Sequence, residues 1–298
     1  MADSFNTYGI AKMHKTTGRV IKEDNSYINV ADYTFNSHVD YYKKTLDFGV
    51  QVSKGDVPNH TSIHKFGRNS AVSSTFVPIC ESGFYRTPTS NTSLEVVSDN
   101  ANDTSTGTGA RSITYQGVAI SGSDLIFVTN TVSLNGTSAV ALPDSLLRLY
   151  RWQVATSGTY AHQTAPSHAG TLTIQETGGG DAWSTIAINT FGRGQSQIGA
   201  YTVPTGYSAF MTDITSSIES DKEAEILLYQ RNGVLNTTAP YDPMRLVTEI
   251  SSAKGVQTII FSSPLKFEEE TDIIFFAKLK AGTAPATIDF TLYLVENV

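Results

Sequence analysis

Short segments of alternating apolar and polar residues follow one another from about residue 91 to the end of the chain, at intervals of about 8 to 15 residues. In the clearest of them, residues 287–295, apolar side chains occupy every second position from Ile288 to Leu294. Successive side chains of a strand point to opposite faces of its sheet, so this segment has one core face and one wet or interfacial face. The pattern predicts an all-β fold with two β-sandwich domains of jelly-roll-like type.

The glycine triplet Gly178-Gly179-Gly180 predicts the boundary between these domains, because three consecutive glycines cost too much backbone entropy inside a strand. We therefore predict a first β-sandwich domain over residues 91–180 and a second, jelly-roll-like one over residues 181–298. The pair Asn135-Gly136 predicts a tight hairpin turn within the first domain.

Residues 1–90 are polar and lack sustained periodicity, which predicts an extended N-terminal arm or docking segment. A capping pattern at Ser37 and Asp40 favours one short helix that ends before Gly49. The alternative for this region is a set of strands that completes the first sandwich.

The chain is acidic and poor in charged residues, and this composition excludes some classes of binding partner. Its net charge is −7 and charged residues make up 16% of it, below the average of about 25% for soluble proteins. Binding to nucleic acid requires clustered Lys and Arg, so no direct nucleic-acid binding is expected. No apolar run approaches the roughly 20 residues that span a bilayer, so no membrane insertion is expected. The single cysteine, Cys80, excludes an internal disulfide and is predicted to be a buried small hydrophobe.

Patterns that could carry catalysis are each incomplete. His60 and His64 have helical spacing but lack the Glu of the zinc-hydrolase motif between them. The run from Glu268 to Glu270 places acids in sequence, whereas a glycosidase pair must face each other across a cleft. No serine lies in a Gly-X-Ser-X-Gly motif, and no glycine-rich segment ends in the Gly-Lys-Ser/Thr of a phosphate loop. We therefore expect no enzyme activity, no catalytic residue and no cofactor.

The segment Asp99-Asn100-Ala101-Asn102-Asp103 is rich in oxygen ligands and resembles a calcium loop at first sight. The order of an EF-hand fails because Ala101 stands at the third position. An Asx-rich turn is the prediction, and a bound divalent ion is the alternative.

Arginine and aromatic side chains are the best candidates for protein contacts. Arg148, Tyr150 and Trp152 share one face of a predicted strand, and an Arg, Tyr and Trp stripe is typical of interface hot spots. A position in the sandwich core is the alternative for Trp152. Arg111 and Arg193 follow or lie within glycine-rich turns and are available for carboxylates on a partner. The predicted interface comprises Phe66, Arg68, Arg111, Arg148, Tyr150 and Arg193.

Several short motifs follow one another between about residues 60 and 280. They are Lys65-Phe66-Gly67, Tyr85 with Pro88, Asp103-Thr104-Ser105-Thr106-Gly107-Thr108-Gly109-Ala110-Arg111, Leu134-Asn135-Gly136, Arg148-Leu149-Tyr150-Arg151, Ala169-Gly170-Thr171-Leu172-Thr173-Ile174, Gly194-Gln195-Ser196-Gln197, Tyr201-Thr202-Val203-Pro204-Thr205-Gly206 and Glu270-Thr271-Asp272-Ile273. Their ordered succession resembles a family of virion structural proteins of tailed bacteriophages, especially marine ones.

This resemblance implies a virion protein that is assembled in the host cytoplasm and acts without catalysis. Its expected partners are other virion proteins, either major capsid or tail proteins, and copies of itself. Capsid decoration or cement and a tail or adaptor position are both compatible with it. The alternative is a receptor- or carbohydrate-binding tail appendage, in which Tyr160, Trp183, Tyr207 or Tyr241 stacks on sugars.

Overall fold

The computed structural model describes residues 47–297 except 163–164, 189–192 and 220, together with four short strands before residue 29. The chain is mostly β, as predicted, with one short helix in the part that the structure describes. Its contacts divide it into two units, Met1–Pro58 and Asn59–Val298. No helix among the described residues is long and apolar enough to cross a membrane.

The first unit contains a small antiparallel sheet and a helix. The sheet has the order β1 (Phe5–Tyr8), β2 (Ala11–His14), β3 (Val20–Ile21) and β4 (Tyr27–Ile28). The helix α2 (Phe48–Ser53) begins after Asp47, whose Oδ1 accepts a hydrogen bond of 2.8 Å from the Gly49 amide, as N-cap residues do. The helix predicted to start near Ser37 lies outside the described residues.

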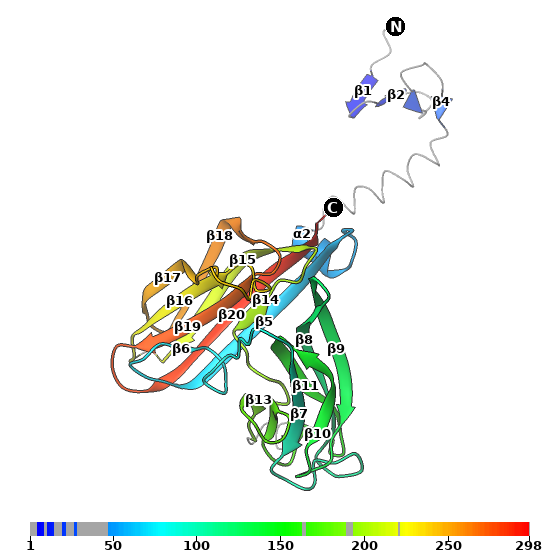
Figure 1. Ribbon diagram of the computed structural model, residues 1–298. Helices are drawn as coiled ribbons and strands as arrows, with labels where there is room; N and C mark the ends of the chain where they lie inside the picture. The colour runs from blue at the N-terminus through cyan, green and yellow to red at the C-terminus, as the bar shows by residue number, and fades with distance from the viewer. Residues whose placement is uncertain are drawn as a thin grey trace. The chain divides into compact units, whose positions relative to one another are not determined.

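In the second unit, two antiparallel sheets form what we call the large sheet pair (Figure 1). One has the order β18 (Val256–Phe267), β15 (Tyr207–Ile218), β20 (Ala284–Glu296) and β5 (His60–Val72). The other has the order β14 (Ala200–Thr202), β19 (Asp272–Leu279), β16 (Ala224–Arg231) and β17 (Arg245–Ala253), and β6 (Val77–Pro78) also pairs with β19.

Two further antiparallel sheets form the small sheet pair, which is inserted in the chain between β6 and β14. One has the order β10 (Val140–Leu146), β7 (Thr92–Ser98), β12 (Leu172–Glu176) and β13 (Ala182–Ile186). The other has the order β11 (Arg148–Ser157), β8 (Ala110–Ser121) and β9 (Asp124–Ser133). Each sheet pair has a hydrophobic core, and Val118 and Tyr150 of the small pair join the core of the large one.

The alternation predicted near the end of the chain is confirmed in β20. Ile288, Phe290 and Leu292 are fully buried, and the residues between them are half-buried on the opposite face. The buried face packs into the core of the large sheet pair, and Phe290 stacks at a tilt on Phe275 of the facing sheet with ring centroids 5.0 Å apart. Burial of a large apolar side chain contributes roughly 1.5 to 3 kcal/mol, so this strand is a main source of stability.

The strand β5 lies inside the predicted arm, yet it is the edge strand of a sheet. It pairs with β20 from His60 to Val72, and Figure 1 shows the two strands side by side although they come from opposite ends of the second unit. Residues 60–72 therefore complete the large sheet pair, which corrects both the prediction of an arm and the alternative of strands in the first sandwich. Its central buried positions are Lys65, Gly67 and Asn69, none of which has an apolar side chain, so the strand lacks the apolar signal of a core strand.

The glycine triplet at 178–180 forms the turn of a hairpin, because β13 after it pairs with β12 before it. Gly178 and Gly179 have positive φ values of 88° and 76°, which favour glycine. Their amides donate hydrogen bonds of 3.1 and 3.0 Å to the two carboxylate oxygens of Glu95, and Gln175 Nε2 donates a third. The bond from Gln175, followed by those from the glycine amides, lowers the pKa of Glu95. The boundary predicted at residue 180 thus falls inside a hairpin.

The Asn135-Gly136 pair forms a turn, but the strands on its two sides do not pair with each other. Gly136 has the positive φ, 61°, that the turn requires. The strand before it, β9, and the strand after it, β10, belong to different sheets, and Asn135 bridges to Thr104 instead. The predicted hairpin is therefore a connection between the two sheets of the small pair.

Candidate functional site

Arg148 and Asp272 form a buried ion pair that joins the two sheet pairs. Nε and Nη2 of Arg148 donate to Oδ1 and Oδ2 of Asp272 at 3.1 and 2.9 Å, and the two side chains are 0% and 2% exposed. Nη1 donates to the carbonyl oxygens of Pro88 and Leu147, and Thr202 Oγ1 donates to Asp272 Oδ1 at 2.7 Å. Because the guanidinium is satisfied within the chain, Arg148 is corrected from a predicted interface residue to an interior one.

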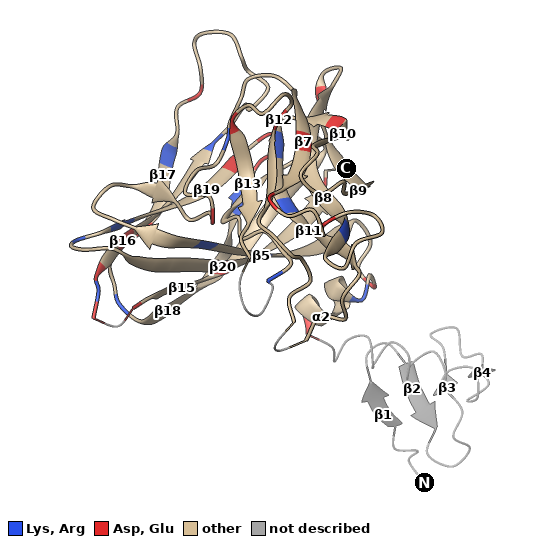
Figure 2. Cartoon of the chain, turned by 90° about the horizontal axis from the view of Figure 1, so that it is seen from below, with Lys and Arg blue, Asp and Glu red and all other residues tan. Residues whose placement is uncertain are grey.

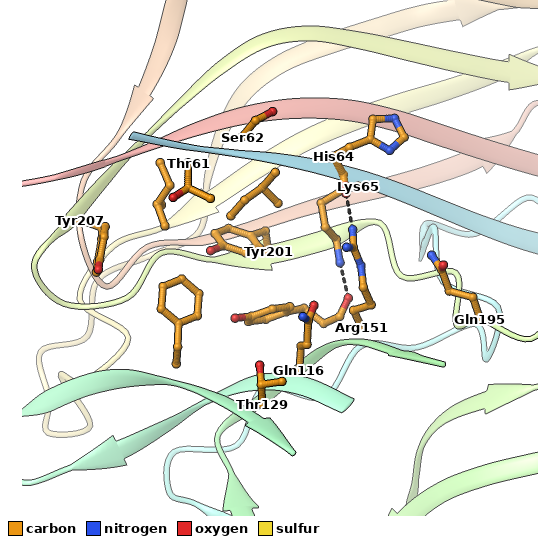
Figure 3. A pocket seen from close by; sticks show the side chains of 14 residues that line it. Thr61, Ser62, His64, Lys65, Gln116, Thr129, Arg151, Gln195, Tyr201 and Tyr207 are labelled. Carbon is orange, nitrogen blue, oxygen red and sulfur yellow. Dashed lines mark hydrogen bonds between the residues drawn. The ribbon is translucent and has the colours of Figure 1, made fainter. Parts of the chain in front are cut away.

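The same junction contains an open cavity of about 630 Å³ between the large and small sheet pairs (Figure 3). Its walls come from β5, β8, β9, β11, β14, β15 and β20, so no single segment of the chain defines it. Aromatic rings and neutral polar groups dominate the lining, which also contains three basic and two apolar residues: His64, Lys65, Arg151, Ile63 and Leu294. None of the described residues that line the cavity is Asp or Glu.

Lys65 crosses the junction from β5. Its ammonium donates to the carbonyl oxygen of Tyr150 and lies 5.4 Å from the centroid of the Tyr150 ring. The residue is 2% exposed, and burial followed by the neighbouring positive charge of Arg151 holds the pKa of Lys65 well below its usual value. Arg151 donates in return to the carbonyl oxygen of His64, so two basic side chains connect β5 with β11.

Tyr150 and Tyr201 stack at the base of the cavity, with ring centroids 4.9 Å apart. Tyr150 is 5% exposed and Tyr201 is 1% exposed, and burial raises the pKa of both phenols. Tyr150 is therefore a second predicted interface residue that the structure places in the interior. The hydroxyl of Tyr201 is buried and interacts with the hydroxyl of Tyr150.

A second surface of interest is the outer face of the sheet β18-β15-β20-β5, the face opposite the core. Three rows of side chains cross it in register: Ile260, Asp213, Thr291 and His64; Thr258, Thr215, Asp289 and Phe66; and Val256, Ser217, Thr287 and Arg68. Several polar groups on it pair with each other, such as His64 Nε2 with Asp289 Oδ1 at 2.7 Å. Val256 and Ile260, on the edge strand, are 70% and 79% exposed.

The predicted interface residues thus separate into different places. Phe66 and Arg68 lie together on the outer face. Arg193 lies beside Arg68 near Glu81, with 3.7 Å between Arg193 Nη1 and Glu81 Oε1. Arg111 is half-buried and donates to the Gly107 carbonyl oxygen at 2.9 Å, a contact within its own turn.

The Asx-rich turn at 99–103 is confirmed, since the Asn102 amide donates to Asn100 Oδ1 at 2.9 Å. Asp103 at its end is fully buried, and its carboxylate accepts hydrogen bonds of 2.6 to 2.9 Å from Ser98 Oγ and the amides of Ala110, Ala169 and Gly170. No group of three or more His, Cys, Asp or Glu in the described part of the chain is placed to hold a metal ion. The carboxylate of Asp103 ties three segments of the small sheet pair together.

The glycines around Asp103 explain two of the sequence motifs. A Cβ on Gly109 would lie 2.1 Å from Asp103 Oδ1, and one on Gly170 would lie 2.0 Å from Asp99 Oδ1. Neither position has room for a side chain, because the backbone approaches the carboxylates that it donates to. The motifs 103–111 and 169–174 are therefore two halves of one structural feature.

The aromatic residues predicted to stack on sugars do not form one site. Tyr160 and Tyr241 are 89% and 62% exposed, outside the strands. Trp183 is 4% exposed and its Nε1 donates to Glu176 Oε1 at 3.3 Å, which corrects it to a core residue. Tyr207 lines the cavity, together with Lys65, Tyr201 and Phe127, which sequence reasoning missed because they come from strands distant in sequence.

Cys80 is fully buried, as predicted, and burial raises its pKa from 9.0 to about 12. The unfolded thiol ionises near 9.0, so burial of the neutral thiol contributes stability below pH 9.0 that is lost as the pH rises towards about 12. At pH 8 we expect a thiol reagent such as DTNB to modify Cys80 only after denaturant is added. Rapid reaction of the native protein would contradict its placement.

No family model and no curated protein matches this sequence. Among solved structures, the chain is similar to a structure of infectious bursal disease virus, strain Gx, at 9% identity and a TM-score of 0.20, over 80% of this chain and 76% of that one. It is also similar to the insecticidal delta-endotoxin Cry8Ea1 from Bacillus thuringiensis, at 9% identity and a TM-score of 0.18, over 83% of this chain and 55% of that one. Scores of this size do not establish a shared fold.

Proposed function

We propose that this chain is a non-enzymatic structural component of a tailed-phage virion, which acts through contacts with other virion proteins and with copies of itself. In this proposal each sheet pair is a β-sandwich domain, the large one jelly-roll-like, and the segment before residue 59 is a docking arm. The ordered motifs between residues 65 and 273 support the virion assignment. A capsid-decorating position and a tail or adaptor position both fit it.

The observation that carries the contact function is the apolar edge of the outer face. Val256 and Ile260 are among the most exposed large apolar residues described, and both lie on β18, the edge strand of its sheet. An exposed edge strand with apolar side chains is a template for association with another chain. Monomeric proteins prevent such association by placing charged side chains on the edge strand or by keeping it short. These two residues are therefore expected to be covered in an assembly.

The rest of the outer face is suited to the same role. Thr215 and Thr258 are hydrogen-bonded at 3.0 Å, and His64 pairs with Asp289, so these polar groups are satisfied within the face. Charged residues are sparse on the described elements, as the predominance of tan in Figure 2 shows. A partner can pack on the apolar edge at Val256 and Ile260 with little cost for desolvating charge, whereas Asp213, Asp289 and Arg68 place charge on the rest of the face.

Replacing Ile260 with lysine is expected to abolish incorporation into particles while the protein stays folded, because the change places a charge in the apolar contact without touching the core. The measurement is the copy number of tagged protein in purified particles, by quantitative mass spectrometry after complementation. Thermal unfolding of the isolated variant verifies the fold.

The matched control is Ser138→Lys, which adds the same charge at an exposed position of the small sheet pair. It should incorporate like the unmodified protein. Equal incorporation of Ile260→Lys and Ser138→Lys would reject the outer face as the contact, and absence of the unmodified protein from purified particles would reject the virion role.

A further inference from the structure

The sheet β18-β15-β20-β5 has one covered edge and one open edge. Other parts of the chain cover the β5 edge: Arg151 donates to the carbonyl oxygen of His64, and the Arg68 amide donates to the carbonyl oxygen of Gln197 at 3.5 Å. On the side of β18 that faces away from β15, no described strand pairs with it, and Figure 1 shows β18 at the margin of the large sheet pair. The open edge of the sheet is therefore β18.

The backbone groups of alternate residues of β18 are directed to this open side. The Ile218 amide donates to the carbonyl oxygen of Gly255 at 2.9 Å, at the position that continues the register between β15 and β18. In an antiparallel pair, residues exchange hydrogen bonds with the neighbouring strand at every second position. Val256, Thr258 and Ile260 therefore direct their N–H and C=O groups away from β15, towards a side without a described strand.

This open segment has a defined beginning and end. Gly255, with a positive φ of 60°, lies in the turn that leads into β18. Residues 261–264 bulge from the sheet, because all of them oppose the single residue Thr212 of β15, and Pro264 has no N–H to donate. Thr258 lies midway between the turn and the bulge, so the part of the strand that is free to pair is centred on it.

The open segment lacks the features that keep edge strands apart. Charged side chains and proline are the usual means of blocking an edge strand. Residues 255–263 contain no Lys, Arg, Asp, Glu or Pro. The side chains of Val256 and Ile260, which lie on the outer face on either side of Thr258, are 70% and 79% exposed. A strand added here meets an apolar surface and unpaired backbone groups together.

We infer that this edge pairs with the same edge of a second copy of the chain, antiparallel, with Thr258 opposite Thr258 of the second copy. In this register Val256 faces Ile260 of the second copy at both ends of the pairing, so apolar side chains meet each other. The outward N–H and C=O groups of both copies are then all paired, and no like charges face each other.

The symmetry of the segment is what selects a second copy as the partner. A two-fold axis through Thr258 places the turn at Gly255 of one copy opposite the beginning of the bulge, Phe261, of the other. The interface is isologous, and the two four-stranded sheets become one continuous sheet. This inference rests on the proposed contact function of the edge and specifies its partner.

The test traps the pair with single cysteines in the full chain. Hydrogen-bonded residues of an antiparallel pair have Cα atoms about 5.5 Å apart, within the range of about 4.4 to 6.8 Å that a disulfide spans. With copper phenanthroline as the oxidant, Thr258→Cys is expected to form disulfide-linked dimers at least about tenfold faster than the control Ser138→Cys, because pairing raises the effective thiol concentration. Ser138 is exposed on the small sheet pair, and the native Cys80 is buried.

Two further variants test the register. Two Val256 residues lie about 14 Å apart in the inferred pair, because each is displaced by four residues along the strands. Val256→Cys and Ile260→Cys should therefore each cross-link as slowly as Ser138→Cys when alone. An equimolar mixture of the two should cross-link faster than either. Electrophoresis without reducing agent measures the dimer, and thermal unfolding verifies the fold of each variant.

Cross-linking of Thr258→Cys no faster than that of Ser138→Cys would overturn the pairing, and Val256→Cys that cross-links alone as fast as the mixture would overturn the register. These results are distinct from the test of the virion role. If Thr258→Cys does not cross-link but Ile260→Lys is still lost from particles, the edge contacts a different virion protein and only the second copy is rejected. If Thr258→Cys cross-links but the unmodified protein is absent from particles, the pairing stands and the virion role is rejected.

Discussion

Replacing Asp272 with alanine is expected to lower the free energy of unfolding by about 3 to 5 kcal/mol, because it leaves the Arg148 guanidinium buried without its anion. The carboxylate also accepts from Thr202 at 2.7 Å and lies 3.9 Å from Arg231, so these groups lose a partner as well. Urea denaturation followed by intrinsic fluorescence measures the change. Since the pair joins the two sheet pairs, we also expect their unfolding transitions to separate in this variant.

Two comparisons make this prediction specific to burial. Glu268→Ala removes one partner of an exposed ion pair, Lys266–Glu268 at 3.0 Å, and should cost less than about 1 kcal/mol. The double variant Arg148→Met with Asp272→Leu replaces both charges by apolar groups and should recover most of the loss. A cost for Asp272→Ala no larger than that for Glu268→Ala would contradict the role of the pair.

Replacing Asp103 with alanine is expected to lower the free energy of unfolding by at least about 3 kcal/mol, because four donors, three of them in buried hydrogen bonds, lose their acceptor at once. Asp103→Asn should lower the free energy of unfolding by less than Asp103→Ala does. The carbonyl oxygen of the asparagine side chain can still accept hydrogen bonds, while its NH2 group faces backbone N–H donors and cannot accept from them. Thermal and urea unfolding measure both variants, and circular dichroism reports whether the sheets of the small pair persist.

The control for Asp103 is Asp124→Ala, at an exposed aspartate that begins β9. It should change stability by less than about 0.5 kcal/mol. Addition of calcium is a further comparison, because the alternative of a bound ion at 99–103 expects the metal to stabilise the unmodified protein and not Asp103→Ala. Equal stability of Asp103→Ala and Asp124→Ala would show that the carboxylate does not hold the turn.

Local periodicity was enough to predict the features that depend on neighbours in sequence. The two-residue repeat from Ile288 to Leu294 identified the core face of β20, because side chains of a strand alternate between its faces. The Asx-rich composition at 99–103 predicted its turn, since Asn and Asp side chains bond to the backbone two residues on. Cys80 was predicted to be buried from its residue type, which behaves as a small hydrophobe.

Turn signals were less reliable about what the turns connect. Gly178 and Gly179 of the triplet have the positive φ values that glycine permits, yet the triplet closes a hairpin rather than separating domains. Asn135-Gly136 also turns as expected, yet it links strands of different sheets. Turn chemistry reports the local backbone conformation, whereas strand pairing depends on which segments share a buried face.

The sequence of this protein therefore specified a β-rich chain, its clearest core strand and the conformations of its turns. The tertiary structure decided which distant segments meet: β5 pairs with β20, and Arg148 finds Asp272 at a separation of 124 residues. The same arginine could serve a partner or its own core, and only the acid opposite it distinguishes the two. The cavity is likewise invisible in any one segment, because seven strands contribute to its walls. Long-range pairing is set by the free energy of the whole packed core, which no local pattern contains.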